Sequence, residues 1–311
     1  MQRERLVIVT CETRLEELKQ RFVTLEQARF YLDRAGQELG PLERQHQQFA
    51  GAVDTVRAAV PDDLPVQVVR REMISSFPFR QSDLVVTIGP DGLVANTVKY
   101  ALGIPIIAVN PDPDTIEGIL CRIEPEDFRR VLKQTLADQV GMRAMTLAEA
   151  ATSDGQRLLA VNDLFIGRRD HVSARYRIEI DGKTEQHSSS GIVVSTGVGS
   201  TGWMRSILQG AHRTANAWGV SGAPAEPKIK KLAWDTDALF YFVREPFPSV
   251  GLGTELTTGR IANGTSLTVT SEMAQSGVIF SDGIIQDAIE FHSGLTAQIR
   301  VSASYGLIVD H

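Results

Sequence analysis

Three short stretches of this sequence combine small residues with carboxylate, amide or hydroxyl side chains, which are groups that bind nucleotides. In the first, Val85–Gly92, a buried strand is predicted to enter a turn that holds Gly89, Asp91 and Gly92, and a helix follows. The free N–H groups at a helix N-terminus attract phosphates. Asp91 could accept the proton of a substrate hydroxyl or help to hold a magnesium ion. It could also do no more than cap the helix, since aspartate is favoured at that position.

The second stretch places two polar residues, Asn162 and Asp163, inside the apolar run Val161–Ile166. Neighbouring side chains of a strand point to opposite faces, so a turn or the end of a strand explains the pair better. Amide and carboxylate groups can read the amide and ribose hydroxyl groups of a nucleotide. The same pair is common in turns, and both interpretations stay open on this stretch alone.

The third stretch, Gly191–Trp203, begins as a strand and continues as a loop of small residues and hydroxyls, with a helix expected to follow. Small residues let a ligand approach the backbone, and hydroxyl and N–H groups can bind phosphate or ribose. The loop lacks the Gly-Lys-Ser/Thr ending of a P-loop. A flexible linker is the alternative, and the strand-like sequence before the loop counts against it. The candidate binding residues of the loop are Ser195, Thr196, Gly199, Ser200 and Thr201.

Composition excludes several classes of protein. The 311 residues carry a formal net charge of -6, which argues against a general nucleic-acid binder. The early apolar run Leu6–Val9 is far too short for a signal peptide or a membrane span, and no later run reaches membrane length. Cys11 and Cys121 have neither zinc-site spacing nor a disulfide pattern, and no residue is assigned as a metal ligand. We therefore expect a cytoplasmic protein that binds small molecules.

The first half of the chain alternates strands and helices, which predicts a parallel sheet with helices on its faces, an α/β domain over residues 1–142. The expected strands are Leu6–Thr10, Val66–Arg70, Leu84–Ile88 and Ile104–Val109. The expected helices are Arg14–Ala35 (one or two helices, broken at Gly36–Gly40), Glu43–Ala59, Leu93–Leu102 and Pro125–Gln139.

The second half, residues 143–295, is predicted to be a β-rich domain, and residues 296–311 are a candidate for completing the first domain. Ser206–Lys231 is an expected insertion of helix and loop, with Gly219–Pro224 as its loosest part. Turn signals are Asp181-Gly182, Asn263-Gly264 and Asp282-Gly283. Examples of the expected strands are Arg157–Phe165, Ala174–Ile180, Ile192–Thr196, Leu239–Val243, Ser266–Thr270 and Gln298–Ser302.

In this order, the three stretches and Asp282-Gly283 resemble the motifs of the NAD kinase family. Those motifs are Gly-Gly-Asp-Gly, Asn-Glu, Ser-Thr-x-x-Gly-Ser-Thr and a late Asp-Gly. Further stretches look like the mitochondrial-type branch and its bacterial relatives. They are Val109–Asp114 with Glu117-Gly118, Val161–Gly167, Ser173–Tyr176, Ser189–Gly191 and Phe242–Pro246.

The resemblance implies a doubly wound N-terminal domain, a β-rich C-terminal domain and an active site in the cleft between them. It implies ATP or another phosphate donor, a divalent metal such as Mg²⁺, and NAD, whose adenosine-ribose 2′-hydroxyl is phosphorylated to give NADP. By position, Asp91 is then the catalytic carboxylate, and Asn162 and Asp163 hold the NAD. Thr196, Ser200 and Thr201 line the nucleotide loop. Homodimers or larger homo-oligomers are typical of the family.

Three residues depart from the family pattern. Pro90 replaces a glycine and removes an N–H, Leu93 replaces a threonine, and Asp163 replaces a glutamate. These changes leave open a nucleotide-binding homologue with weakened catalysis. A kinase of the same superfamily that acts on a sugar or lipid hydroxyl is the other alternative, and fold alone does not decide. A dehydrogenase is disfavoured because no GxGxxG follows Leu6–Thr10.

Overall fold

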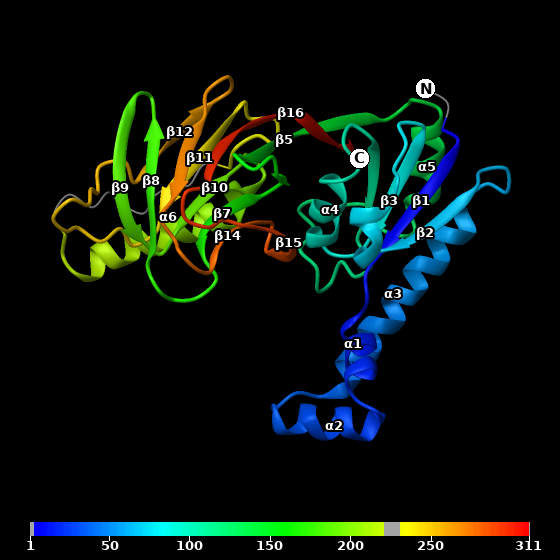
Figure 1. Cartoon of the computed structure of the whole chain (residues 1–311). Coiled ribbons are helices and arrows are strands. Elements are labelled where there is room, and N and C mark those ends of the chain that lie inside the picture. Colours follow the sequence, from blue (N-terminus) through cyan, green and yellow to red (C-terminus); the bar gives the residue numbers. More distant parts are fainter. Residues whose placement is uncertain (1–2, 221–230, 311) are drawn as a thin grey trace. The chain divides into compact units, whose positions relative to one another are not determined.

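The structure, a computed structural model, describes residues 3–220 and 231–310 (Figure 1). Contacts between residues group the chain into two units. Unit 1 runs to Arg143 and takes in the chain again from Leu307, and unit 2 comprises Ala144–Gly306. The functional domain boundaries expected from the sequence, at residues 143 and 296, stay a prediction.

Unit 1 is built on a parallel sheet, as the alternation of strands and helices predicts. Its strand order is β2-β1-β3-β4, with the end of β16 beside β4. Every residue of β3 and β4 is buried, and both strands are mostly apolar, as expected of strands inside a parallel sheet. The strands are β1 (Arg5–Thr10), β2 (Val66–Arg70), β3 (Asp83–Ile88), β4 (Pro105–Val109) and β16 (Thr296–Asp310).

Helices α3 and α5 pack on this sheet through a core that includes Val56, Val86 and Phe128. Figure 1 shows α1 and α2 beside the N-terminal end of α3, where they share a small core of leucines and alanine. The helices of unit 1 are α1 (Arg14–Arg21), α2 (Leu25–Arg34), α3 (Leu39–Ala59), α4 (Asp91–Val98) and α5 (Phe128–Leu136), with a short 3-10 helix at Arg71–Ser76.

Side-chain capping explains where α1 and α2 begin. The expected helical segment Arg14–Ala35 is two helices, because Thr13 and Thr24 each cap a new one with a side-chain hydroxyl. The break expected at Gly36–Gly40 is shorter than predicted, since α3 already begins at Leu39. Helix α4 begins two residues before the expected Leu93 and ends at Val98.

Unit 2 is antiparallel and β-rich, so the predicted fold class is confirmed for both halves of the chain. One sheet has the order β12-β11-β10-β7-β14-β15, and the other runs β16-β13-β8-β9, with β5 and β6 at its side. A large apolar core packs between their strands. The strands are β5 (Gly141–Thr152), β6 (Arg157–Ala160), β7 (Asp163–Arg168), β8 (Ala174–Ile180), β9 (Lys183–Ser189), β10 (Ile192–Ser195), β11 (Ala238–Val243), β12 (Thr258–Ala262), β13 (Leu267–Ser271), β14 (Gly277–Ser281) and β15 (Ile284–Glu290).

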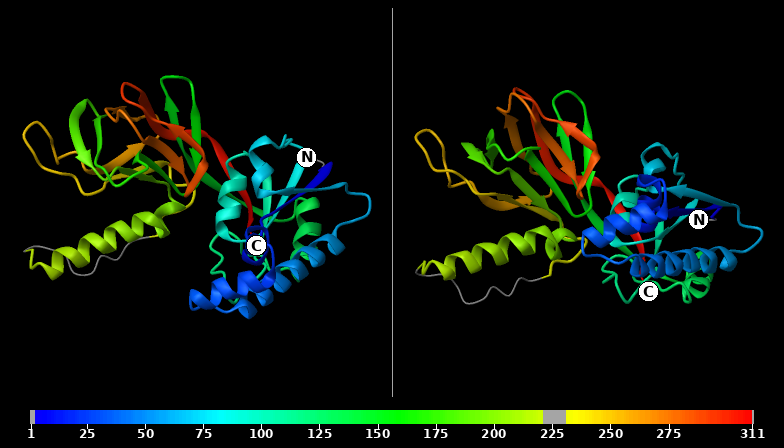
Figure 2. Two further views of the ribbon diagram at one scale, coloured as in Figure 1. Left: turned by 60° about the horizontal axis from the view of Figure 1, so that its bottom comes forward. Right: turned by 90° about the horizontal axis from the view of Figure 1, so that it is seen from below.

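Helix α6 (Trp203–Ala217) lies along the six-stranded sheet (Figure 2). Its Trp203 and Ile207 side chains pack on Phe165 and Val193. It starts before the insertion expected at Ser206–Lys231. Most of Gly219–Pro224, the part expected to be loosest, lies outside the described residues. The expected strand Arg157–Phe165 is interrupted at Val161–Asn162, which gives β6 and β7.

Candidate functional site

The turn after β3 carries the predicted catalytic carboxylate. The N–H of Gly89 donates to the carbonyl of Val109, so the turn is tied to the end of β4. Gly89 has φ +153°, and a Cβ there would lie 2.8 Å from Leu93 Cδ2 and 3.3 Å from Cys11 Sγ. The positive φ favours glycine at this position, and the close Leu93 and Cys11 side chains leave little room for a larger residue. No atom would lie within 4 Å of a Cβ at Gly92, the second residue of α4.

Asp91 is the first residue of α4, and Pro90 occupies the N-cap. The Asp91 side chain therefore does not cap its own helix; it holds the loop that follows β4. Oδ1 accepts the N–H groups of Leu120 (2.8 Å) and Cys121 (3.0 Å), and Oδ2 accepts the N–H of Ile119 (2.9 Å). Among the described residues, Oδ2 has this one donor, which leaves it a lone pair for a further hydroxyl.

The Cys121 thiol supports the same carboxylate. Burial raises the pKa of Cys121, and the charge of Asp91 together with their hydrogen bond raises it further. The thiol therefore stays protonated and donates to Asp91 Oδ1 at 3.2 Å. Backbone N–H groups from a distant loop carry no sequence signature, so sequence reasoning missed this arrangement.

In unit 2, the Asn162–Asp163 pair lies at the bend between β6 and β7. The Asp282 carboxylate accepts the N–H groups of Val161 (3.0 Å), Asn162 (2.7 Å) and Asp163 (3.3 Å). Asp282 and Gly283, both with positive φ, form the tight turn between β14 and β15. The turn was expected from the sequence, and its role in holding the bend was missed.

The two polar side chains at this bend have different surroundings. The side-chain amide of the half-buried Asn162 makes no hydrogen bond to any described residue, so its donors and acceptor are available to a ligand. Asp163 is buried and accepts a hydrogen bond from the Ser195 hydroxyl. Burial raises the pKa of Asp163 to about 7, the Ser195 hydrogen bond opposes that shift, and the nearby Asp282 charge adds to it.

We expect the stability of the protein to depend on the titration of Asp163. Its pKa is raised by folding, so its stabilising contribution is complete below about pH 4 and is lost as the pH rises through about 7. The free energy of unfolding should fall by at most about 1.4 kcal/mol per pH unit across that range because of this group.

Urea unfolding at several pH values checks this expectation. Asp163→Asn should flatten the pH dependence between pH 4 and 7, because asparagine keeps the Ser195 partner without titrating. Asp181→Asn, in the exposed turn between β8 and β9, is the matched control. An unchanged pH profile in Asp163→Asn would refute the shifted pKa.

The loop after β10 is a packed turn rather than a flexible linker. The N–H of Thr196 donates to the carbonyl of Asn162 (2.9 Å). The Thr196 hydroxyl donates to the carbonyl of Val161 and accepts the N–H groups of Val198 (3.1 Å) and Gly199 (3.2 Å). These bonds fasten the third predicted stretch to the second.

The remaining hydroxyls of this loop also have protein partners. Ser200 donates to the carbonyl of Gly197 (2.7 Å) and accepts the N–H of Leu232 (3.2 Å), and the Thr201 hydroxyl lies 3.4 Å from the carbonyl of Val198. Each hydroxyl keeps acceptor capacity for a ligand donor. In the structure, however, the hydrogen bonds of these hydroxyls fix the shape of the loop.

The glycines of the loop are required by neighbouring backbone. A Cβ on Gly197 would lie 2.0 Å from the Ala233 carbonyl oxygen, and one on Gly199 would lie 2.3 Å from the Asn162 carbonyl oxygen. Real Cβ atoms do not approach oxygen that closely. The sequence pattern suggested room for a ligand, and the structure shows close approach of the chain to itself.

The structure thus gathers the predicted residues into two groups. Unit 1 holds Gly89, Asp91 and Gly92 in one turn, and unit 2 holds the other seven around the bend at Asn162 and the loop from Ser195. In the part of the chain that the structure describes, no three His, Cys, Asp or Glu side chains group as metal ligands. None of the described helices is long and apolar enough to cross a membrane.

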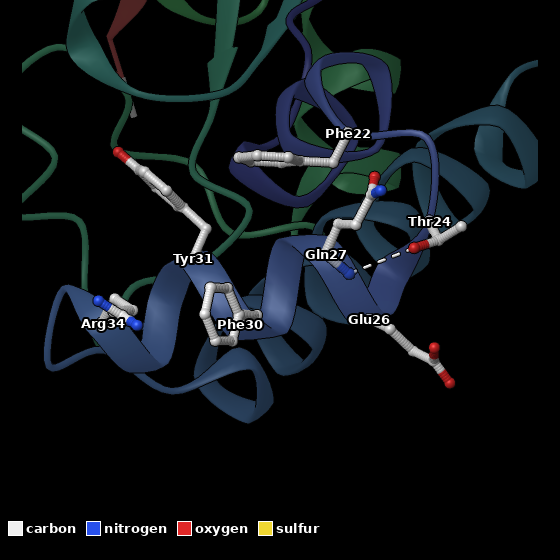
Figure 3. A pocket seen from close by; sticks show the side chains of 7 residues that line it. All are labelled: Phe22, Thr24, Glu26, Gln27, Phe30, Tyr31 and Arg34. Carbon is white, nitrogen blue, oxygen red and sulfur yellow. Dashed lines mark hydrogen bonds between the residues drawn. The ribbon is translucent and has the colours of Figure 1, made fainter.

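A separate open hollow lies on α2 (Figure 3). The Phe22 and Tyr31 rings stand 5.1 Å apart, and the Arg34 guanidinium lies 5.0 Å from the Phe30 ring centre. None of the predicted site residues contributes to it. Its lining residues are Phe22, Thr24, Glu26, Gln27, Phe30, Tyr31 and Arg34.

Comparison with known proteins gives the following relatives. No family model matches the chain. The chain is 27% identical to the protein named NAD kinase 2, mitochondrial, of Rattus norvegicus, over 65% of this chain and 60% of that protein. It is 29% identical to an NAD kinase of Methanoregula boonei over 74% of each chain. The chain therefore spans less than two thirds of the length of the mitochondrial relatives.

Two solved structures share the fold. Yeast NADH kinase complexed with NADH matches with a TM-score of 0.65 and 14% identity, over 100% of this chain and 84% of that one. An NAD kinase from Archaeoglobus fulgidus in complex with ATP matches with a TM-score of 0.56 and 16% identity, over 98% and 93%. The resemblance that the motifs predicted is confirmed: relatives named NAD kinase match the sequence, and solved NAD and NADH kinases share the fold.

Proposed function

We propose that this protein transfers the terminal phosphate of ATP to the adenosine-ribose 2′-hydroxyl of NAD and so makes NADP. The observation that carries the proposal is the Asp91 carboxylate. It lies at the carboxyl end of a parallel strand, in the first turn of a helix, and is fixed by three backbone N–H groups. Relatives named NAD kinase at 27% and 29% identity support the choice of substrate.

Asp91 acts on the acceptor hydroxyl in this proposal. Its Oδ2 accepts the 2′-hydroxyl proton as the 2′-oxygen forms a bond to the γ-phosphorus of ATP. The bond between the γ-phosphorus and the β,γ-bridging oxygen breaks, and ADP leaves. The rigid backbone bonds to Asp91 keep the base oriented, so little reorganisation is needed during the reaction.

The unit 2 residues hold the dinucleotide in this proposal. The amide of Asn162 is the group with free hydrogen-bonding capacity, and Asp163 accepts a ribose hydroxyl beside Ser195. Thr196, Ser200 and Thr201 shape the loop that the nucleotide contacts. Mg²⁺ enters as part of the Mg-ATP substrate, since this ion is held largely by phosphate oxygens and waters and needs few protein ligands.

We also propose a homodimer or a larger homo-oligomer and a cytoplasmic location. The oligomer comes from the family resemblance, and the cytoplasmic location comes from the reduced cysteines expected at Cys11 and Cys121. Light scattering of the purified chain measures the molar mass directly, and a monomer of 34.1 kDa at all concentrations would contradict the oligomer.

Binding and turnover together test the proposed function. Calorimetry measures the affinity of the full chain for NAD, and an NADP-specific dehydrogenase reports NADP made from NAD, Mg²⁺ and ATP. We expect both binding and turnover. Binding of NAD without turnover, with ATP, other triphosphates or polyphosphate as donor, would contradict the kinase and leave a nucleotide-binding homologue disabled at Pro90 and Leu93.

A further inference from the structure

Helix α2 buries one face and leaves the opposite face exposed. Ala28 and Leu32, one turn apart, belong to the small core that α2 shares with α1 and α3. Phe30 is two residues from each of them and points the other way, since each residue turns the helix by about 100°. The Phe30 side chain is 62% exposed, and Tyr31 and Val23 beside it are 41% and 92% exposed. Neighbouring large apolar side chains that face solvent mark an interaction surface.

The hollow on this face has the composition of a protein interface. The Arg34 guanidinium lies over the Phe30 ring, and Figure 3 shows Phe30 standing between Arg34 and Glu26 along the helix. Aromatic and arginine side chains are enriched at the centres of protein–protein interfaces. With a volume of about 630 Å³, the hollow can admit an aromatic ring from a partner. The exposed face of α2 therefore fits another protein surface.

The charges of this face match themselves under a two-fold rotation. Glu26 comes four residues before Phe30 and Arg34 four residues after it, so each lies about 6 Å from Phe30 along the helix axis. A spacing of four residues also keeps the three side chains on one face. If a second α2 packs antiparallel, with the two-fold axis beside Phe30, each Glu26 faces the Arg34 of the other copy. Glu26 has no ion-pair partner among the residues that the structure describes.

We propose that α2 is a dimer interface, at which two copies of this chain pack antiparallel with Phe30 against Phe30 and form two Glu26–Arg34 ion pairs. The inference names a surface for the homo-oligomer proposed above. A two-fold contact uses the same patch on both copies, so self-complementary charge favours a second copy over an unlike partner. Because α2 has only ten residues, the contact is smaller than a standard interface, and we expect a weak dimer with a micromolar Kd.

Sedimentation equilibrium of the full chain over a range of concentrations measures the dimer Kd. The mass should rise from 34.1 kDa towards twice that value. Phe30→Asp should raise the Kd at least about thirtyfold, because the aromatic ring at the centre of the contact is lost from both copies. Val250→Asp is the matched control, since this side chain is fully exposed in unit 2, and it should leave the Kd within about twofold.

Charge reversal tests the pairing itself. Glu26→Arg and Arg34→Glu each place like charges opposite each other at both ends of the contact, and each should raise the Kd about tenfold. The double variant brings opposite charges together again, so its Kd should return to within about threefold of the wild type. Both side chains are exposed, and their replacement should leave the fold intact.

The possible outcomes lead to different conclusions. A dimer whose Kd is unchanged in Phe30→Asp and in both charge reversals would overturn this interface and leave the homo-oligomer to another surface. A monomer at all concentrations would overturn both proposals. A monomer that binds anionic lipid vesicles, and loses that binding in Phe30→Asp, would assign the surface to a membrane instead. Association is measured without nucleotides, so a chain that makes no NADP could still confirm the interface.

Discussion

Asp91→Asn is expected to lower kcat for NADP formation at least about a hundredfold, because a positioned general base contributes about 10²- to 10⁴-fold. The amide cannot take the 2′-hydroxyl proton. Its NH₂ group also cannot accept all the backbone N–H groups of Ile119, Leu120 and Cys121. Steady-state kinetics with ATP and NAD measures the loss.

Asp91 also holds the loop after β4, so the folding and the NAD binding of Asp91→Asn must be measured as well as its activity. Circular dichroism should remain that of the wild type, and the Kd for NAD, set by residues of unit 2, should change less than about threefold. Asp127→Asn is the matched control in the same unit, since the Asp127 side chain is 47% exposed and pairs with Arg130 at 2.8 Å. A loss of activity below about tenfold in folded Asp91→Asn would remove Asp91 from the reaction.

Gly199→Ala is expected to cost the binding of NAD and part of the stability of unit 2. The new methyl group would lie 2.3 Å from the Asn162 carbonyl oxygen and 2.8 Å from Asp163 Oδ1, so the loop must move away from the bend. Overpacking of this kind costs about 1–3 kcal/mol, and the displaced bend should weaken NAD binding at least about tenfold.

Calorimetric titration with NAD and thermal unfolding measure the two effects. Gly210→Ala is the control, because a Cβ at this position of α6 meets no atom within 4 Å. Alanine there should leave NAD binding unchanged and stabilise the protein by about 0.5–1 kcal/mol. Equal NAD affinity in Gly199→Ala and the wild type would show that the bend and the loop do not form one binding surface.

The sequence predicted the fold class because hydrophobic pattern and turn chemistry are local signals. Strands β1, β3 and β4 are centred on short apolar runs, and the dipeptides Asp181-Gly182 and Asp282-Gly283 form the turns that their sequence predicted. Strands without such a pattern were missed. Strand β9, Lys183–Ser189, is almost wholly polar, yet its pairing with β8 buries its last three residues.

The motifs identified the candidate residues, and the contacts of those residues could not be read from them. Asp91 and Asp282 each bind backbone N–H groups far away in the sequence, and backbone donors are the same in every residue type but proline. The packing role of Gly199 could not be predicted either, because its loop and the bend at Asn162 come close together only in the folded chain. The exposure of Phe30 on α2 likewise needed the structure.

The most direct test of the proposed kinase follows the phosphate itself. Full-length protein is mixed with ATP carrying labelled γ-phosphate, with Mg²⁺ and with NAD, and the products are separated after a single turnover. The account predicts label in the 2′-phosphate of NADP, at a rate that Asp91→Asn lowers. Label that stays in ATP or appears only as free phosphate, in a protein that binds NAD, would contradict the transfer to the 2′-hydroxyl.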